Sequence, residues 1–326
     1  MLQLERVPVD QADWAALDAQ PDRVVFQTRE WLRFLEETQG AEPVLARLRD
    51  GTSDAGWFTG AIVRRFGVKI LGSPFPGWTT ASMGFNLHDG VERQAAVRAL
   101  TRFAFRELGC LHLELKDREL GHPELAGLGF GHSETITYEI DLTADEETLL
   151  SRMSSSARRN IRLGERNGLT VERGSGEPFA DDFHAQLTDV FAKHGLTPTY
   201  GVERVRALIR HLEPSGNLVL LRARTAEGES AATAIFPGIN GTCYFWGGAS
   251  WRRHYPLRPN ELLFWHVMRE WKQRGAATLD TAGGGAYKEK YGPRGTVHVP
   301  HFRKARLPGL LAARDLAERV VRRGRD

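Results

Sequence analysis

The sequence predicts an α/β protein made of two tandem units, each with a central mixed β-sheet flanked by helices. Strand-like and helix-like segments alternate along all 326 residues, a pattern typical of sheets covered by helices. The chain also resembles itself. The segments "FRELGCLHLE" (105–114) and "WKQRGAATLD" (271–280) both join an aromatic-bearing helix, through a glycine, to a short strand that ends in a carboxylate. Duplication of one unit explains this match most simply, and coincidence of a common helix–strand connection is the alternative.

The first unit is expected to span residues 1–141. Thr28 can cap a helix that runs to Gln39, and segments rich in β-branched and aromatic residues follow as strands. A glycine- and proline-rich loop, "GSPFPGWTT", then leads to a helix that ends before Gly109. The predicted strands of this unit lie at 43–48, 57–64, 68–71, 110–115 and 134–142, and its second helix lies at 91–108.

The second unit, residues 142–306, is expected to open with a single amphipathic helix from Glu146. Apolar residues recur there at every fourth position and form one face, whereas arginines occupy another. Like charges at helical spacing repel unless an anion lies across them. The arginine face therefore indicates either a solvated surface or a grip on phosphate. The apolar residues are Leu149, Met153, Ala157 and Ile161, and the arginines are Arg152, Arg159, Arg162 and Arg166.

The end of the second unit is the richest in unusual residues. A strand at 242–247 leads through the basic turn 251–258 into a helix that Asn260 can cap and that Gly275 ends. A short strand, "ATLDT", then runs into three consecutive glycines, Gly283 to Gly285. Glycines at this place let the backbone approach a neighbour that side chains would keep away.

Composition restricts the classes of function. The formal net charge is only +3, so a diffuse polyanion-coating role is excluded, no DNA partner is expected, and any anion site must be local. Cys110 and Cys243 are the only cysteines, and they lack the spacing of a disulfide framework or a zinc site. We expect no metal. The absence of an apolar leader or a membrane-length apolar run predicts a cytoplasmic protein.

Four motifs in this order carry a family resemblance: "ARRNIR", "PNELLFWHVM", "LDTAGGG" and "YKEKYG". Together they resemble the FemAB-like branch of the GNAT acyltransferase superfamily, which includes the BioF2-like acetyltransferase domains. The resemblance covers residues 134–306 well and the first half more loosely. It implies tandem GNAT-like units that transfer an acyl or aminoacyl group to an amine of a cell-envelope, polysaccharide or small-molecule acceptor. The donor would be aminoacyl-tRNA or acyl-CoA, with no tightly bound cofactor.

The resemblance also implies roles for individual residues. The family's terminal lysine, here Lys288, would lie by the reacting carbonyl and hold the developing oxyanion. Asp280, at the end of the last strand, is the candidate base, with His254 and His266 as other candidates. Ordinary GNAT enzymes cradle coenzyme A pyrophosphate with glycine-rich backbone, but "WRRHYPLRPN" has no glycine at that place. The expected donor or phosphate ligands are therefore Arg159, Arg162, Arg252, Arg253, Arg258, Gly283, Gly284 and Gly285, and the expected acceptor pocket contains Phe75, Trp78, Tyr255, Tyr287 and Tyr291.

Structural interpretations stand beside each of these roles. Lys288 can be a surface lysine, Asp280 a capping or salt-bridged acid, and the aromatic residues of 72–85 core packing. The tail, 307–326, predicts a basic amphipathic helix that docks on the protein or contacts a membrane surface weakly. For the whole chain, a tRNA- or RNA-binding module without chemistry and an inactive scaffold in envelope or polysaccharide assembly remain alternatives to an enzyme.

Overall fold

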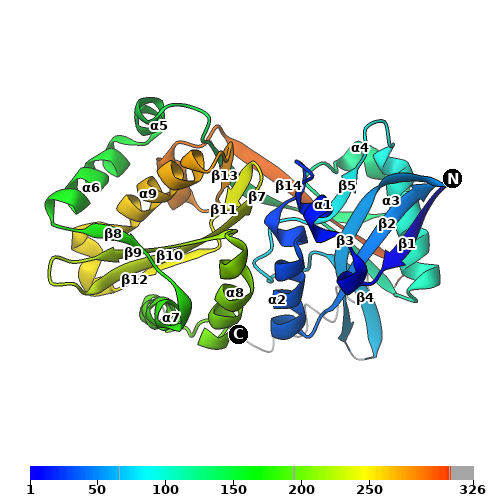
Figure 1. Ribbon diagram of the computed structural model, residues 1–326, viewed down its shortest axis with the longest axis horizontal. Coiled ribbons are helices and arrows are strands. Elements are labelled where there is room, and N and C mark those ends of the chain that lie inside the picture. Colours follow the sequence, from blue (N-terminus) through cyan, green and yellow to red (C-terminus); the bar gives the residue numbers. More distant parts are fainter. Residues whose placement is uncertain (66, 194, 308, 310–326) are drawn as a thin grey trace. The chain divides into compact units, whose positions relative to one another are not determined.

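The computed structural model describes residues 1–65, 67–193, 195–307 and 309, and they form two compact units (Figure 1). Among the described residues, unit 1 contains Met1–Asp13, Gln39–Thr135 and 299–307, and unit 2 contains Trp14–Thr38 and Ile136–His298. The predicted mixed α/β class, with sheets flanked by helices, is confirmed. Nearly all of the predicted tail helix, 307–326, lies outside the described residues.

Unit 1 is built on a mixed sheet in the order β1-β2-β3-β4-β6-β14, with β5 also pairing with β3. Neighbours are antiparallel except for β4 and β6, which are parallel. The helix α3 and the π-helical turn that continues it supply buried residues to the core, including Leu100 and Phe103. The elements are β1 (Leu2–Val7), β2 (Glu42–Asp50), β3 (Ser53–Arg65), β4 (Val68–Ser73), β5 (Gly84–Leu87), α3 (Arg93–Arg102), the π-helix Phe103–Glu107, β6 (His112–Leu115), α4 (His122–Leu125) and β14 (Thr296–Ala305).

Unit 2 has the strand order β7-β13-β11-β10-β9-β8, with β12 also pairing with β10. Here β11 and β13 are the parallel pair. The strands are β7 (Gly131–Asp141), β8 (Thr170–Arg173), β9 (Leu218–Arg224), β10 (Ser230–Ile239), β11 (Thr242–Tyr244), β12 (Gly247–Ser250) and β13 (Thr278–Asp280). The helices are α1 (Trp14–Asp18), α2 (Arg29–Gln39), α5 (Glu146–Arg152), α6 (Ser155–Arg166), α7 (Gly176–Ala192), α8 (Val202–Leu212) and α9 (Pro259–Gln273), and the main 3-10 helices are Arg252–Leu257 and Ala286–Tyr291.

Helices cover both faces of the unit 2 sheet, with α9 and α6 on one side and α7 on the other (Figure 1). Two residues of β10 show this division. Phe236 packs against Phe264 of α9, with ring centroids 5.7 Å apart, whereas the Thr233 hydroxyl donates a hydrogen bond of 2.7 Å to Gln186 of α7. Residues an odd number of positions apart on a strand face opposite sides of the sheet.

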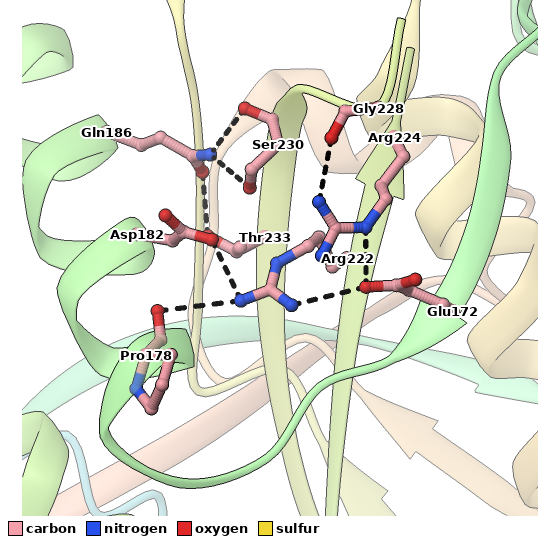
Figure 2. Close-up of polar contacts among 9 residues, drawn as sticks. All are labelled: Glu172, Pro178, Asp182, Gln186, Arg222, Arg224, Gly228, Ser230 and Thr233. Carbon is pink, nitrogen blue, oxygen red and sulfur yellow. Dashed lines mark hydrogen bonds and ion pairs between the residues drawn. The ribbon is translucent and has the colours of Figure 1, made fainter. Parts of the chain in front are cut away.

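A polar network attaches α7 to its face of the sheet (Figure 2). The buried guanidinium of Arg222, on β9, contacts Glu172 at 3.2 Å and Asp182 at 2.8 Å. Gln186 donates to the carbonyl and hydroxyl oxygens of Ser230 at 3.2 and 3.1 Å. Because buried polar groups are costly without partners, these contacts fix the position of α7 on the strands.

The segment Trp14–Thr38 is where the units depart most from the ranges 1–141 and 142–306 expected from sequence. Its aromatic residues complete the core of unit 2: Phe26 packs against Tyr244 of β11, with ring centroids 4.5 Å apart. The Asn240 side chain also donates to the backbone carbonyls of Gln20, at 2.9 Å, and Arg23, at 3.1 Å. The helix predicted at Thr28–Gln39 exists, and Thr28 accepts from Trp31 N as expected of a cap.

Both units contain the same crossover. In unit 1, β4 is followed by α3 and then by β6, parallel to β4. In unit 2, β11 is followed by α9 and then by β13, parallel to β11. The two segments that match in sequence lie at the end of this crossover, where the π-helix leads into β6 and where α9 leads into β13. The partner strand is also divided alike: β4 and β5 pair with successive stretches of β3, as β11 and β12 do with β10.

Candidate functional site

The single helix expected from Glu146 is wrong, because the chain breaks into α5 and α6 at Met153 and Ser154. Ser154 has extended backbone, and its hydroxyl accepts a hydrogen bond of 3.1 Å from Ala157 N. It therefore caps a new helix. Arg158 stabilises the break, since it donates to the backbone carbonyl of Ser151 at 3.0 Å and also contacts that of Met153.

This break brings the motif "ARRNIR" to the motif "YKEKYG". Ser154 N donates to the carbonyl of Lys290 at 2.9 Å. Gly292 has φ +74°, and a Cβ there would lie 2.7 Å from the carbonyl carbon and oxygen of Arg152. Only glycine fits such a position. The final glycine of the motif "YKEKYG" is thus explained by close backbone packing at the end of α5.

The pairing of β11 with β13 ends at Phe245. Its N–H donates to the carbonyl of Asp280 at 2.9 Å, whereas the next N–H, of Trp246, donates to Ile235 of β10 at 3.0 Å. Between its two pairings with β10, this part of the chain has one residue more than β10 has, which is a β-bulge. The continuous strand predicted at 242–247 is therefore divided into β11 and β12. Such a bulge re-aims side chains: Phe245 packs against Phe264 of α9, at 5.0 Å between ring centroids.

Lys288 lies just beyond β13 and is buried, with 8% of its surface exposed. Its ammonium donates to the backbone carbonyls of Thr281, at 2.8 Å, and Gly283, at 3.0 Å. The nitrogen also lies 5.4 Å from the ring centroid of Phe245 and 5.7 Å from that of Tyr287. Burial lowers the pKa of Lys288, and the charge of Asp280 opposes this shift. The buried position excludes the interpretation as a surface lysine.

Asp280 is also buried, and hydrogen bonds occupy its carboxylate. The Oδ1 atom accepts from the Thr137 hydroxyl at 2.5 Å and from Ala282 N at 2.7 Å. Ala282 adopts the left-handed conformation, with φ +51°, so this carboxylate holds a turn that alanine rarely adopts. The capping interpretation of Asp280 therefore accounts for its contacts. Thr137, which sequence analysis missed, lies on β7, far away in the chain.

Gly283, Gly284 and Gly285 form the loop between Asp280 and Lys288. Gly283 has φ +135°, and Gly283 N donates to the Thr137 hydroxyl at 3.0 Å. A Cβ on Gly284 would meet the Ile136 side chain at 2.3 Å. These glycines thus allow close packing within the protein, and Gly283 is held by Lys288 through its carbonyl.

A cavity of about 160 Å³ lies at the start of α9, lined by Tyr255, Arg258, Pro259, Asn260 and Glu261. The helix begins at Pro259, and its N-terminal cap is Arg258, which has the left-handed conformation. Asn260 lies within the helix and is not its cap. The Asn260 side chain instead donates to the Ser250 hydroxyl at 3.1 Å. Tyr255 and Arg258, predicted for the acceptor and the donor respectively, therefore line one cavity.

Glu261 places a buried carboxylate in the first turn of α9. Its Oε1 atom accepts from Lys290 at 2.8 Å and from Asn160 of α6 at 3.0 Å. Burial raises the pKa of Glu261, but the hydrogen bonds from Lys290 and Asn160 outweigh it and lower the pKa below its ordinary value. Sequence analysis missed this acid, although a glutamate within the apolar run "ELLFW" is a signal of a buried polar contact.

The predicted phosphate arginines fall into two groups. Arg252 forms a two-atom contact with Asp189, at 3.1 and 3.0 Å, and Arg253 contacts Glu229 at 3.2 Å. Both are thus engaged with carboxylates. Arg159 and Arg162 are exposed on the side of α6 that faces away from α9. Among the described residues, no carboxylate forms an ion pair with Arg159, Arg162 or Arg258. These three arginines therefore form the second group of the predicted set.

The five predicted acceptor aromatics are divided between the two units and differ in burial. Tyr291 is 2% exposed and stacks on Phe264 at 3.9 Å between ring centroids, so it belongs to the core of unit 2. Phe75 and Trp78 are buried in unit 1 and pack against each other at 4.7 Å. Tyr287 is 57% exposed beside Lys288. Core packing therefore explains three of the five, and Tyr287 and Tyr255 remain available to a ligand.

Residues 151–291 match the domain family described as acetyltransferase (GNAT) domain. This part of the chain is therefore similar to a GNAT acetyltransferase domain. The matched range begins before α6 and ends at Tyr291, so it includes the cavity at α9, the bulge at Phe245 and the buried Lys288. No curated protein matches the chain in sequence.

Solved structures share the fold over almost the whole chain. FemX has a TM-score of 0.74 at 14% identity, covering 93% of this chain and 97% of that chain. A tandem GNAT protein from the clavulanic acid biosynthesis pathway has a TM-score of 0.57 at 13% identity, covering 95% and 100%. The C-terminal domain of a putative lysylphosphatidylglycerol synthetase from Agrobacterium fabrum has a TM-score of 0.53 at 14% identity, covering 82% and 85%. The predicted resemblance to the FemAB-like branch of the GNAT superfamily is confirmed.

In the part of the chain that the structure describes, the histidine, cysteine, aspartate and glutamate side chains form no group of three that could hold a metal ion. Among the same residues, every helix is too short or too polar to cross a bilayer.

Proposed function

We propose that the protein transfers an aminoacyl group from aminoacyl-tRNA to an amine. In this proposal the Lys288 ammonium donates a hydrogen bond to the acyl oxygen. The observation that carries this proposal is the buried ammonium of Lys288, fixed by two carbonyls of the glycine loop. An ammonium has three N–H donors, so one is left for the oxygen that gains charge. A fixed donor in a water-poor site stabilises a tetrahedral oxyanion strongly.

The bulge at Phe245 strengthens the case for Lys288. The backbone N–H groups of Phe245 and Trp246 both have carbonyl acceptors within the sheet. Neither is therefore available to an acyl oxygen without breaking a strand contact. The side chain of Lys288 supplies the donor that this backbone does not.

In the reaction, the neutral amine attacks the acyl carbonyl carbon and forms a C–N bond. The ester C–O bond to the tRNA ribose breaks, and the amine's proton passes through a base or water to the departing hydroxyl. Asp280 is a weak candidate for that base because Thr137 and Ala282 N already occupy its Oδ1 atom. The turn that Asp280 holds positions the loop carbonyls for Lys288.

The start of α9 favours aminoacyl-tRNA over acyl-CoA. Phosphate binds at helix N-termini through free backbone N–H groups and is repelled by carboxylates. Here the first helical residue is Pro259, which has no N–H, and Glu261 places a carboxylate in the first turn. A pyrophosphate is therefore poorly matched to this end of α9. The likeness to a putative lysylphosphatidylglycerol synthetase supports an aminoacyl group, whereas the acetyltransferase (GNAT) match makes acyl-CoA the second candidate.

The deciding experiment incubates the protein with an amine panel and one donor class at a time. The panel contains a lysine-bearing peptide and an amino sugar, and the donors are charged tRNA and short-chain acyl-CoA. Mass spectrometry should find aminoacylated amine with charged tRNA alone. Product from acyl-CoA alone would reassign the donor but keep acyl transfer. Tight tRNA binding without product would favour an RNA-binding module, and neither binding nor product would favour a scaffold.

A further inference from the structure

A second, larger cavity lies on the outer face of α9, in the half of the helix near its C-terminus. Its volume is about 440 Å³, and its walls come from α9, its C-terminal cap and β8. It shares no lining residue with the cavity at the start of α9 or with the loop around Lys288. The lining residues are Arg173, His266, Arg269, Glu270, Gln273 and Arg274. We call this set the arginine pocket.

The arginine pocket holds more positive than negative charge. Three guanidinium groups and one carboxylate, that of Glu270, line it. Arg173 contacts Glu270, and Arg274 lies 3.5 Å from the same carboxylate, so two cations share one anion. Arg269 contacts Glu146 of α5, which lies outside the lining, at 3.0 Å.

The neighbouring groups do not cancel this excess. Burial lowers the pKa of His266, and the nearby Arg269 lowers it further, so both favour the neutral imidazole. Burial also lowers the pKa of Arg173, and Arg274 adds to the shift, which is the effect expected when two guanidinium groups lie close together. Glu270 is the one carboxylate shared by Arg173 and Arg274, so a further anion would still be attracted to this pair.

We propose that the arginine pocket binds the phosphate group of a small phosphorylated ligand. Guanidinium groups match phosphate because their planar N–H donors form paired hydrogen bonds with its oxygens. A volume of about 440 Å³ is within the range of small-ligand sites, roughly 300–1,000 Å³. The site is separate from the proposed acyl-transfer chemistry and does not depend on it.

Isothermal titration calorimetry at low ionic strength tests this site with sodium pyrophosphate, AMP and a short single-stranded RNA as separate titrants. The wild-type protein should bind pyrophosphate and AMP. The double variant R173Q/R269Q should bind them at least about tenfold more weakly, because each charge-assisted contact contributes this much or more. The matched control is R206Q, which removes a guanidinium paired with Asp181 and Glu203 on the other face of the unit. It should bind like wild type.

The variant Glu270→Gln separates binding from a purely structural role. It removes the only carboxylate of the lining, so pyrophosphate should bind more tightly, by about threefold or more at low salt. If the arginines only neutralise Glu270, this variant would lower the melting temperature and leave phosphate affinity unchanged. That result, absence of pyrophosphate binding to wild type, or binding of RNA alone would overturn the proposal.

Discussion

Replacement of Lys288 by methionine is the most direct test of the proposed chemistry. Methionine keeps most of the length and apolar volume of the side chain but removes the ammonium. The change takes away the hydrogen bonds to Thr281 and Gly283 and, on our proposal, the donor to the acyl oxygen.

The two consequences differ in size. Hydrogen bonds from a charged donor contribute about 1.5–3 kcal/mol each, but methionine also relieves the cost of a buried ammonium, whose pKa burial lowers. We therefore expect the free energy of unfolding to fall by about 1–3 kcal/mol. Loss of one hydrogen-bond donor to the oxyanion should lower kcat by roughly 10²–10³-fold. A fall of about 1–3 kcal/mol in the free energy of unfolding does not explain such a loss of kcat, because the protein remains folded.

Lys272→Met is the matched control. Lys272 also donates to two backbone carbonyls of the same unit, those of Leu142 at 3.0 Å and Thr143 at 3.3 Å, but it lies away from the glycine loop. Product formation by mass spectrometry, with circular dichroism melting of both variants, separates the effects. If K288M keeps kcat within about threefold of K272M, Lys288 only clamps the loop and the proposed mechanism is wrong.

Four other expectations follow from the described contacts. Because burial lowers the pKa of Lys288 below its ordinary value of 10.5, the rate should fall at a pH below 10.5 as the ammonium deprotonates, and a pH–rate profile of K288M should lack this limb. Burial raises the pKa of Asp117, in unit 1, from 3.8 to about 6. The folded protein therefore keeps this proton to a higher pH than the unfolded chain does. Its contribution to the free energy of unfolding is fully present below pH 3.8 and is lost as the pH rises through 6, by up to about 3 kcal/mol. Urea unfolding at pH 4.5 and 7 should show this fall in wild type and not in D117N. Gly292→Ala should cost about 2–4 kcal/mol in a urea titration, because its φ and the nearby backbone both exclude a Cβ; a near-neutral result would contradict the described packing. Finally, R159E/R162E should weaken tRNA binding and flatten its salt dependence in a filter-binding assay, whereas an unchanged salt slope would identify a merely solvated arginine face.

The sequence allowed the fold class, the repeat and most elements to be predicted, because these depend on local pattern. Apolar spacing located the last helix, and Gly275 ended it as expected. The break between α5 and α6 was missed because Met153 continues the apolar face. Ser154 forms a cap there that the periodicity alone does not reveal.

The site was harder to predict because its partners are distant in sequence. Thr137 donates to Asp280 although more than a hundred residues separate them in the chain, and no local pattern in the sequence indicates this contact. Arg252 is predicted as a phosphate ligand, and its contact with Asp189 of α7 is equally distant in sequence. Tyr287 and Tyr291 are the same residue type and lie four positions apart in the sequence. Tyr291 is buried because it stacks on Phe264, whereas Tyr287 is exposed, and the sequence does not distinguish the two.

The membership of Trp14–Thr38 in unit 2 has a consequence for biosynthesis. These residues leave the ribosome early, yet Phe26 packs against Tyr244, which is made more than two hundred residues later. The aromatic side chains of Trp14–Thr38 therefore stay exposed to solvent until β11 has been translated. We therefore expect nascent chains stalled before Tyr244 to recruit chaperones, and a fragment starting at Leu142 to aggregate.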